Sequence, residues 1–262
     1  MALLQGVYVA YKKNGEKYYR SSITYNNKHI SLGSFESELK AHNAYRVARN
    51  ILFSNTSQLE DFSTKHYISF HKWVVLHNYK NNGVYIKNPI YLHKYYFSYF
   101  LDQNTELKFD VDDLFYYSNH KIFRRNGYLF VNDYGMQVNI LSRYGIKNYA
   151  IEGKDYIFKD GDTTNFRYHN IEVINPYYGV SIHNKNDRCY YVAKIHINGD
   201  YIIGKYNTLE IAAIAYNKAV DYVKKHKNIH KNFTKNFIEN MDTVTYKKIY
   251  DDIPISHKLI NL

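Results

Sequence analysis

Two stretches of the sequence, one near each end, share the same order of residue types. Residues 6–48 read GVYVAYKKNGEKYYRSSITYNNKHISLGSFESELKAHNAYRVA, and residues 179–219 read GVSIHNKNDRCYYVAKIHINGDYIIGKYNTLEIAAIAYNKA. Equivalent positions include Gly6 and Gly179, Ile23 and Ile195, Gly33 and Gly204, and Tyr45 and Tyr216, and their offset drifts only from 173 to 171 residues. An internal duplication explains this agreement, so both copies are expected to adopt the same fold.

Each copy has the pattern of a three-stranded antiparallel sheet followed by a helix. In the first copy, residues 7–11, 17–24 and 28–33 are rich in Tyr, Val, Ile, Ser and Thr, and Asn-Gly and Asn-Asn turns separate them. Ser37, or Thr208 in the second copy, is placed to cap a helix. The following alanines recur on one helical face. Small alanines let the helix lie close against one face of the sheet, which leaves the other face exposed.

Positive charge is concentrated in the same two regions of a chain whose net charge is +11. Residues 1–55 hold 8 basic and 3 acidic residues (+5), residues 56–173 hold 14 and 13 (+1), and residues 174–262 hold 13 and 8 (+5). Basic ends around a neutral centre favour two polyanion-binding modules joined by a spacer. The alternative is a generic basic protein. The single cysteine excludes an internal disulfide bond and a cysteine-rich zinc site.

Both copies resemble the DNA-binding domain of plant ethylene-response factors, the Apetala family, which also occurs in phage integrases and homing nucleases. The resemblance covers about 45 residues in each copy. It is carried by the Gly-Val opening, the L-G-x-F or I-G-x-Y strand end, and the A-x-x-A-Y-x-x-A helix. It implies that each three-stranded sheet enters the major groove of double-stranded DNA, with outward side chains touching bases and phosphates.

Strand alternation selects the side chains on the exposed sheet faces. Ile23 and Ile195 are expected to face the helix, so their neighbours at odd offsets face outward. The candidate DNA contacts are Tyr8, Arg20, Ser22, Thr24, His29 and Ser31 in the first copy, and Ser181, His183, Lys194, His196, Tyr201 and Ile203 in the second. Arg20 and Lys194 supply the cations, and the apolar groups suit thymine methyls. The family has several arginines and tryptophans on this face, whereas Arg20 and Lys194 are the only cations selected here. The base specificity of the family therefore does not carry over to this chain. Alternatively, half of these residues are ordinary exposed strand positions.

Residues 126–175 resemble the HNH endonuclease class that accompanies Apetala-type domains in phage. The stretch KDGDTTNFRYHNIEVIN, from Lys159 to Asn175, keeps the family's spacing of Gly161, Asn165, Arg167, Asn170 and Ile171. HNH catalysis needs histidine to activate water and further ligands to hold a metal. This chain has Phe158 and Asn139 at the two histidine-type positions, and neither side chain serves as a general base. We therefore expect a degenerate HNH domain without catalytic residues, bound metal or cofactor.

Other side chains offer little compensation for the missing histidines. His66, His71 and His77 are spaced by five and six residues, so they do not share a helical face. Asp160 and Asp162 provide either a weak cation site or simply a turn. Asp110, Asp112 and Asp113 have no accompanying histidine, which favours an exposed edge or a helix cap.

Residues 56–125 are unusually aromatic. Six of the twelve residues in IYLHKYYFSYFL, residues 90–101, are Tyr or Phe, and FDVDDLFYY, residues 109–117, continues the pattern. These rings are expected to pack against the HNH remnant as core, and the alternative is a surface for a homodimer or another partner.

These observations predict an α+β chain in which two modules, each a small three-stranded antiparallel sheet plus a helix, flank a central α+β HNH-like domain. The predicted parts are a DNA-binding module (1–55), an aromatic connecting region (56–125), a degenerate HNH-like domain (126–175), a second DNA-binding module (176–226) and a basic C-terminal tail (227–262) that tracks phosphates. The sequence shows no secretory signal or membrane span, so a cytoplasmic, nucleoid-associated protein is expected.

The expected function is sequence-specific binding of double-stranded DNA, for transcription regulation or DNA organisation, in a protein of phage or mobile-element type that does not cleave DNA. One alternative is an active, divergent HNH homing endonuclease with relocated catalytic groups. Another is a protein-interaction factor that has lost DNA binding, although the charge distribution speaks against it.

Overall fold

The computed structural model describes residues 3–186, 188–227, 229 and 231–261. The chain divides into two compact units: the first holds the chain up to Ile140 together with Asp160–Asn170, and the second holds Leu141–Lys159 together with the chain from Ile171 onward. Both units combine helices with small antiparallel sheets, which confirms the α+β prediction. In the described part of the chain, no helix has the length and apolar character needed to cross a lipid bilayer.

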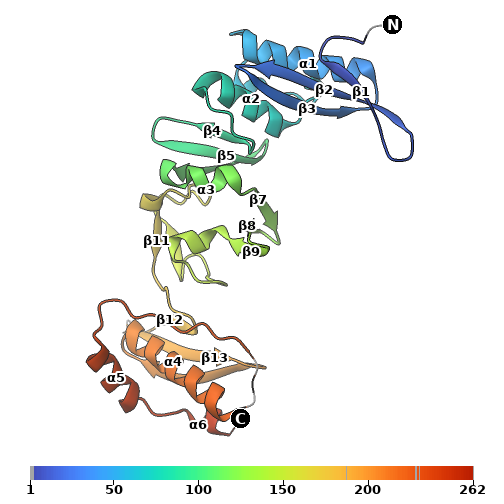
Figure 1. The fold of residues 1–262 in the computed structure, drawn as a ribbon. Helices are drawn as coiled ribbons and strands as arrows, with labels where there is room; N and C mark the ends of the chain where they lie inside the picture. Colours follow the sequence, from blue (N-terminus) through green and yellow to red (C-terminus); the bar gives the residue numbers. More distant parts are fainter. Residues whose placement is uncertain (1–2, 187, 228, 230, 262) are drawn as a thin grey trace. The chain divides into compact units, whose positions relative to one another are not determined.

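The first repeat opens the first unit as a three-stranded antiparallel meander with a helix on one face (Figure 1). Its elements are β1 (Val7–Tyr11), β2 (Lys17–Tyr25), β3 (Lys28–Phe35) and α1 (Glu38–Phe53). The Ser37 side chain accepts a hydrogen bond from the Lys40 backbone N–H and so caps α1. The alanine face of α1 is fully buried against Ile23, Ile30 and Leu32 of the sheet, as the alternation predicts.

The first repeat shares its core with residues far beyond position 55. The elements that follow it in this unit are η1 (Leu59–Asp61), η2 (Thr64–His66), α2 (Phe70–Asn82), β4 (Ile90–Leu92), β5 (Tyr96–Asp102), β6 (Thr105–Asp110), η3 (Val111–Asp113), α3 (Leu114–Asn119), β7 (Ile122–Arg125), β8 (Tyr128–Asp133), β9 (Met136–Asn139) and η5 (Tyr168–Asn170). Trp73, Leu76 and Tyr79 of α2 are buried in one cluster with Ile23 and Ile30. A first module that ends at residue 55 would therefore lose part of its core.

Several aromatic residues of the connecting region are buried as core rather than exposed as a surface. Phe97, Tyr99, Phe109 and Tyr117 are each at most 1% exposed, and the Phe109 ring lies 4.3 Å from that of Tyr117. The Tyr99 hydroxyl accepts a hydrogen bond from the Ile122 backbone N–H, 2.9 Å away, so its burial leaves no orphaned polar atom.

The predicted HNH-like segment is divided between the two units. The loop Asp160–Asn170 belongs to the first unit, where Phe166 stacks on Phe109 with ring centroids 5.4 Å apart. Its backbone also bonds to β6, because Lys108 N–H donates to Thr164 and Phe166 N–H donates to Lys108. The strands on either side of the loop, β10 (Tyr156–Phe158) and β11 (Ile171–Val173), pair antiparallel in the second unit. A 3₁₀ helix, η4 (Ile140–Tyr144), spans the boundary between the two units.

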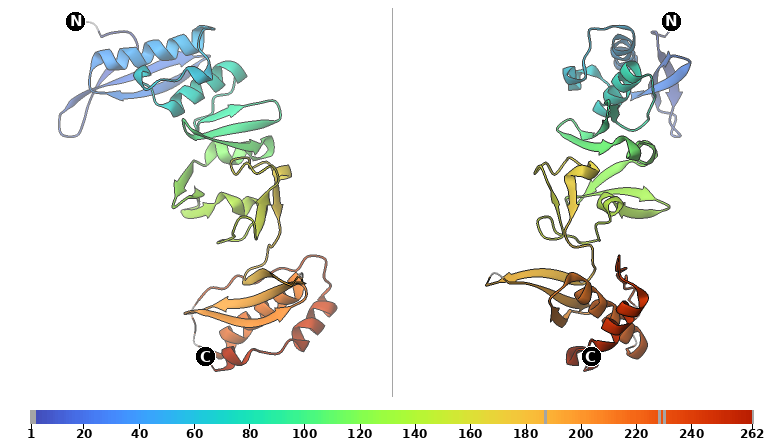
Figure 2. Two further views of the ribbon diagram at one scale, coloured as in Figure 1. Left: turned by 180° about the vertical axis from the view of Figure 1, so that it is seen from behind. Right: turned by 90° about the vertical axis from the view of Figure 1, so that its left-hand side faces the viewer.

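The second repeat has the same topology as the first. Its elements are β12 (Val180–Lys185), β13 (Arg188–His196), β14 (Asp200–Tyr206) and α4 (Leu209–His226). Thr208 caps α4 by accepting from the Ile211 backbone N–H, and Ala212, Ala215 and Ala219 are buried. The views from two sides show α4 on one face of this sheet, with no helix on the other (Figure 2).

The segment predicted as a basic tail is packed rather than free. It contains α5 (Thr243–Asp252) and α6 (His257–Ile260), and Ile238, Ile253 and Leu259 are each at most 7% exposed in the cores around α4. The apolar residues between the lysines cover α4, and burying them outweighs the solvation of a charged tail. Two positions of the basic stretch, Asn228 and His230, lie outside the described residues.

The glycine that opens each repeat touches the tyrosine of its helix. Gly6 has φ +77°, and a Cβ there would lie 2.1 Å from the Tyr45 ring. Gly179 has φ +69°, and a Cβ there would lie 2.1 Å from the Tyr216 ring. Only glycine combines this left-handed conformation with so close an approach. This contact explains why the Gly-Val opening and the Ala-Tyr helix pattern recur together.

Gly179→Ala should destabilise the second repeat by roughly 1–3 kcal/mol, through backbone strain and overpacking against Tyr216. Gly199→Ala is the matched control, because a Cβ there meets no atom within 4 Å, and its effect should stay within about 0.5 kcal/mol. The only tryptophan, Trp73, lies in the other unit, so unfolding should be followed by circular dichroism and by hydrogen exchange of the α4 amides. Equal losses from the two substitutions would contradict the contact with Tyr216.

Candidate nucleic-acid interface

The uncovered face of the first sheet carries five of its six candidate side chains. Tyr8, Arg20 and Ser34 lie side by side across the three strands, because β1 pairs Tyr8 with Arg20 and β3 pairs Ser34 with Arg20. Thr24 and His29 form a second pair further along. The exposed candidates on this face are Tyr8, Arg20, Thr24, His29 and Ser31. Ser34 completes the row at Arg20 and was missing from the predicted set.

Ser22 is the exception, since it is only 8% exposed although it pairs with the outward Ser31. The register shift between Ser21 and Ser22 leaves Leu32 of β3 unpaired, so the alternation along β2 continues and Ser22 is covered rather than turned inward. Ser22 instead lines a pocket of about 470 Å³ with Tyr8, Thr24 and Arg49 of α1. Arg49 follows directly after the buried Ala48, at the border of the buried face of α1. This position is the only feature of the sequence that points to Arg49 as a residue of this pocket.

Arg20 is available to bind an anion. Its side chain is exposed, and it forms no ion pair or hydrogen bond with any residue that the structure describes. A guanidinium presents several N–H donors in a planar fork that matches a phosphate or the edge of guanine. The first face therefore presents an uncompensated cation beside the exposed ring of Tyr8.

The second sheet has a different outward set from the one predicted. Ser181, His183, Lys194 and His196 lie on its uncovered face, where Ser181 is half-buried and the other three are exposed. Tyr201 and Ile203 face the other way and pack against the core around Ile195 and Tyr216.

The pairing of β13 with β14 explains this reversal. Tyr201 pairs with the buried Ile195 and Ile202 pairs with the outward Lys194, so Ile202, which is 46% exposed, takes the outward position. The duplication itself carries the signal that was missed. Because Gly204 is equivalent to Gly33, Ile202 is equivalent to the outward Ser31.

Lys194, unlike Arg20, forms an ion pair within its own sheet. Its Nζ lies 2.7 Å from Asp200 Oδ2, and His196 Nδ1 lies 2.8 Å from Asp200 Oδ1. Hydrogen bonds from Lys194 and His196 hold the pKa of the Asp200 carboxyl below its usual range. An ionised Asp200 therefore compensates Lys194 and repels phosphate at this end of the second face.

An accessible cation of the second face lies on the edge strand. Lys205 pairs with Val192, which pairs with Ser181, and this row is equivalent to the row of Tyr8, Arg20 and Ser34 in the first repeat. The Lys205 Nζ lies 5.3 Å from the centroid of the Tyr190 ring. Each face thus carries one accessible cation in the same row, but on a different strand, so the two faces match different ligand geometries.

The residues that suggested an HNH motif hold their own loop together. Asp160 N–H donates to Asn170 Oδ1 (2.9 Å), Asn165 Nδ2 donates to Asp160 Oδ2 (2.7 Å), and Arg167 Nε donates to Asn165 Oδ1 (2.9 Å). Gly161 has φ +76°, which a tight turn requires. The hydrogen bond from the Asp162 backbone lowers the pKa of Asp160. Turn geometry alone therefore accounts for the spacing of these residues.

A metal site is not formed by the candidate ligands. Phe158 is buried and pairs with Ile171 across β10 and β11. Burial lowers the pKa of His77 to about 4, and His66 stacks on Trp73. Within the described residues, no three His, Cys, Asp or Glu side chains gather where they could hold a metal ion.

Comparison with known proteins gives no relative for this chain. It matches no protein-family model, and no curated protein and no solved structure matches it significantly.

Proposed function

We propose that this chain binds double-stranded DNA sequence-specifically through the uncovered faces of its two repeat sheets. The observation that carries the proposal is that one fold occurs twice, each time with a helix on one sheet face and an accessible cation in the same row of the other. The net charge of +5 at each end of the sequence supports a polyanionic partner.

Four side chains on these faces have chemistry that suits contacts with DNA. The major groove admits a β-ribbon, and an arginine can bond in bidentate fashion to guanine while an apolar side chain contacts a thymine methyl. Arg20 and Tyr8 fill these roles in the first repeat, and Ile202 supplies the apolar contact in the second. Lys205 suits a phosphate, because an ammonium is a compact charge without the planar geometry of arginine.

In this proposal the HNH-like segment contributes structure without catalysis. Asn165, Arg167 and Asn170 of the retained HNH spacing close the Asp160–Asn170 loop, while Phe158 and Asn139 occupy the histidine-type positions. The protein then acts as a transcription regulator or DNA-organising factor of phage or mobile-element type, bound to DNA in the cytoplasm.

Arg20→Ala should weaken binding to the preferred duplex by roughly 1–3 kcal/mol and relax selectivity at one base pair, if Arg20 reads a base. Arg20→Lys keeps the positive charge but loses the planar guanidinium. If Arg20 contacts a base, Arg20→Lys should lose as much affinity as Arg20→Ala. If Arg20 contacts a phosphate, Arg20→Lys should retain most of the affinity. Lys194→Ala is the matched control, because Asp200 already compensates Lys194, and it should cost less than about 1 kcal/mol.

The measurement is fluorescence anisotropy on a duplex selected from genomic fragments and on a scrambled duplex, at several salt concentrations. Unchanged affinity for Arg20→Ala on both duplexes would rule out the first sheet face as a contact surface. The same reactions with Mg²⁺ or Mn²⁺ should leave the DNA intact. Cleavage that follows the protein through purification and disappears in Asp160→Ala would replace the proposal with the endonuclease alternative.

A further inference from the structure

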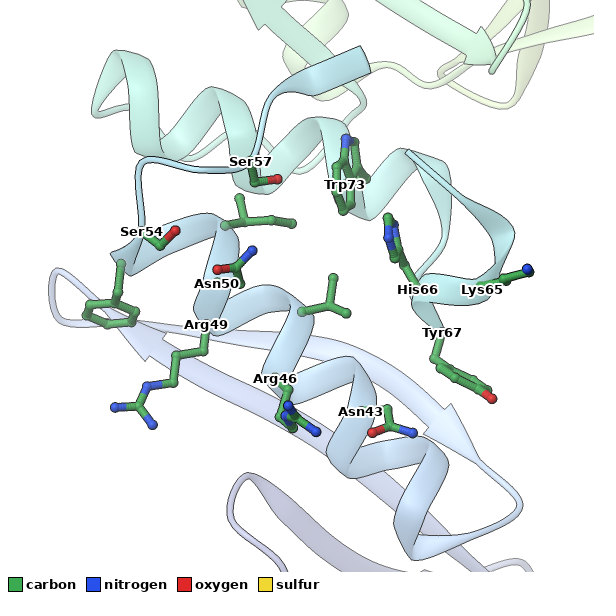
Figure 3. A pocket seen from close by; sticks show the side chains of 13 residues that line it. Asn43, Arg46, Arg49, Asn50, Ser54, Ser57, Lys65, His66, Tyr67 and Trp73 are labelled. Carbon is green, nitrogen blue, oxygen red and sulfur yellow. The ribbon is translucent and has the colours of Figure 1, made fainter. Parts of the chain in front are cut away.

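A pocket on the other side of α1 from the first sheet is lined by three cations. It has a volume of about 740 Å³ and is formed by α1, the segment that follows it, η2 and the start of α2. In Figure 3, α1 forms one wall with Asn43, Arg46 and Asn50, and His66, Tyr67 and Trp73 lie across from it. Arg49 and Lys65 complete the set of cations, and none of the described lining residues is Asp or Glu.

The charge of this pocket is not compensated from within the unit. Arg46, Arg49 and Lys65 are exposed, and in the described part of the chain their side chains form no ion pair and no hydrogen bond. Three like charges around one concave surface raise the local concentration of anions. The amides of Asn43 and Asn50 add neutral donors and acceptors beside them.

The opposite wall holds an aromatic side chain in an unusual backbone conformation. Tyr67 has φ +58° and is 45% exposed. This left-handed conformation is that of the C-cap of η2, which ends the helix there. The neighbouring His66 is fixed by stacking on Trp73, with ring centroids 4.8 Å apart and planes 8° apart. A tyrosine ring is thus displayed at the rim of the basic pocket.

We propose that this pocket binds a nucleotide unit, with its phosphate on Arg46 and Lys65 and its base stacked on Tyr67. A basic groove with an exposed aromatic ring is the combination that binds single-stranded nucleic acid, in which bases are free to stack on protein. Paired bases in a duplex are closed to such a contact. The unit can come from a single strand or from a free nucleotide, and the proposal does not depend on duplex binding by the sheets.

Arg49 connects the pocket with the sheet face. It also lines the smaller pocket that holds Tyr8, Ser22 and Thr24. Phe53 lines both pockets as well, so the two pockets adjoin each other along the end of α1. This continuity favours the single strand as the source of the nucleotide.

The test is fluorescence anisotropy of a labelled ten-nucleotide oligo-dT with the full-length chain. Arg46→Gln combined with Lys65→Gln should weaken binding by roughly tenfold and lower the salt slope by about 0.7 for each lost phosphate contact. The charge-matched control is Lys87→Gln combined with Lys121→Gln, two exposed lysines outside the pocket, and it should change affinity less than about twofold. Equal losses in both double variants would overturn the proposal.

Tyr67 provides a second test that does not alter charge. Tyr67→Gly keeps the left-handed backbone accessible and should cost about fivefold or more in oligo-dT affinity, whereas Tyr67→Phe should stay within about twofold because stacking needs only the ring. No change in Tyr67→Gly would overturn the proposal. Competition by millimolar dTMP would identify a free nucleotide as the source, and competition by unlabelled oligo-dT alone would identify a single strand. Arg20→Ala, which tests the duplex proposal, should leave oligo-dT binding within about twofold.

Discussion

When the selected duplex is shortened, the affinity of the chain for it should fall in a single step, on the order of a hundredfold. The step should occur at the length below which only one of the two sheet faces can still contact the DNA. Two binding modules on one chain gain from effective concentration, so the second contact adds affinity without any new interface. The structure supplies the two faces, with Arg20 on one and Lys205 on the other. Each repeat alone is expected to bind weakly.

Charge reversal identifies the faces that cause the step. Arg20→Glu and Lys205→Glu should each remove it, since either variant leaves one working face, and each should bind long and short duplexes equally. Lys121→Glu changes an exposed lysine that belongs to neither repeat sheet, and it should retain the step. Affinity that declines smoothly with duplex length in the unaltered chain would mean that the two repeats do not act together on one DNA molecule.

Asp155→Ala should destabilise the second unit by about 3–5 kcal/mol, the cost of breaking a buried ion pair from one side. Lys147 Nζ lies 2.8 Å from Asp155 Oδ1, and the two side chains are 8% and 12% exposed. Burial lowers the pKa of Lys147, while Asp155 acts in the opposite direction. The carboxylate also accepts from Asn175 Nδ2 and from the Ile151 backbone N–H. Removing it leaves a buried ammonium without its counter-ion and the Ile151 N–H without this acceptor.

Two further variants test whether the buried ion pair causes this loss of stability. Lys147→Met combined with Asp155→Leu removes both charges and should be less destabilising than Asp155→Ala alone. Glu172→Ala breaks the half-exposed pair with Lys159 and should change stability by no more than about 0.5 kcal/mol. Urea unfolding by circular dichroism, with hydrogen exchange of the α4 amides, measures all three. A cost for Asp155→Ala as small as that for Glu172→Ala would contradict the structural role of the buried pair.

Local sequence patterns were sufficient to predict the two repeats. Strand-like alternation, Asn-Gly turns, a capping Ser or Thr and a row of alanines are short-range properties, and the duplication presents each of them twice. The same patterns place Tyr8, Arg20 and Thr24 on the exposed face, because the unpaired residue at the register shift lies on β3 and leaves the alternation along β1 and β2 intact. The aromatic core around Phe97 and Tyr117 follows from composition alone, because such density of rings requires burial.

The tertiary structure decided what local patterns leave open. Pairing register decides which side chains lie on each face, so Tyr201, opposite the buried Ile195, turns toward the core and Ile202, opposite Lys194, faces outward. Arg49 and Lys65 are far apart in sequence, and only the packing of η2 and α2 beside α1 brings them to one pocket. Likewise, the lysine-rich segment after α4 packs against α4 through the buried side chains of Ile238, Ile253 and Leu259. The sequence by itself determines which segments form strands and helices, because those preferences act between near neighbours. Which side chains share a surface depends on pairing register and long-range burial, and these are settled only when the whole chain packs.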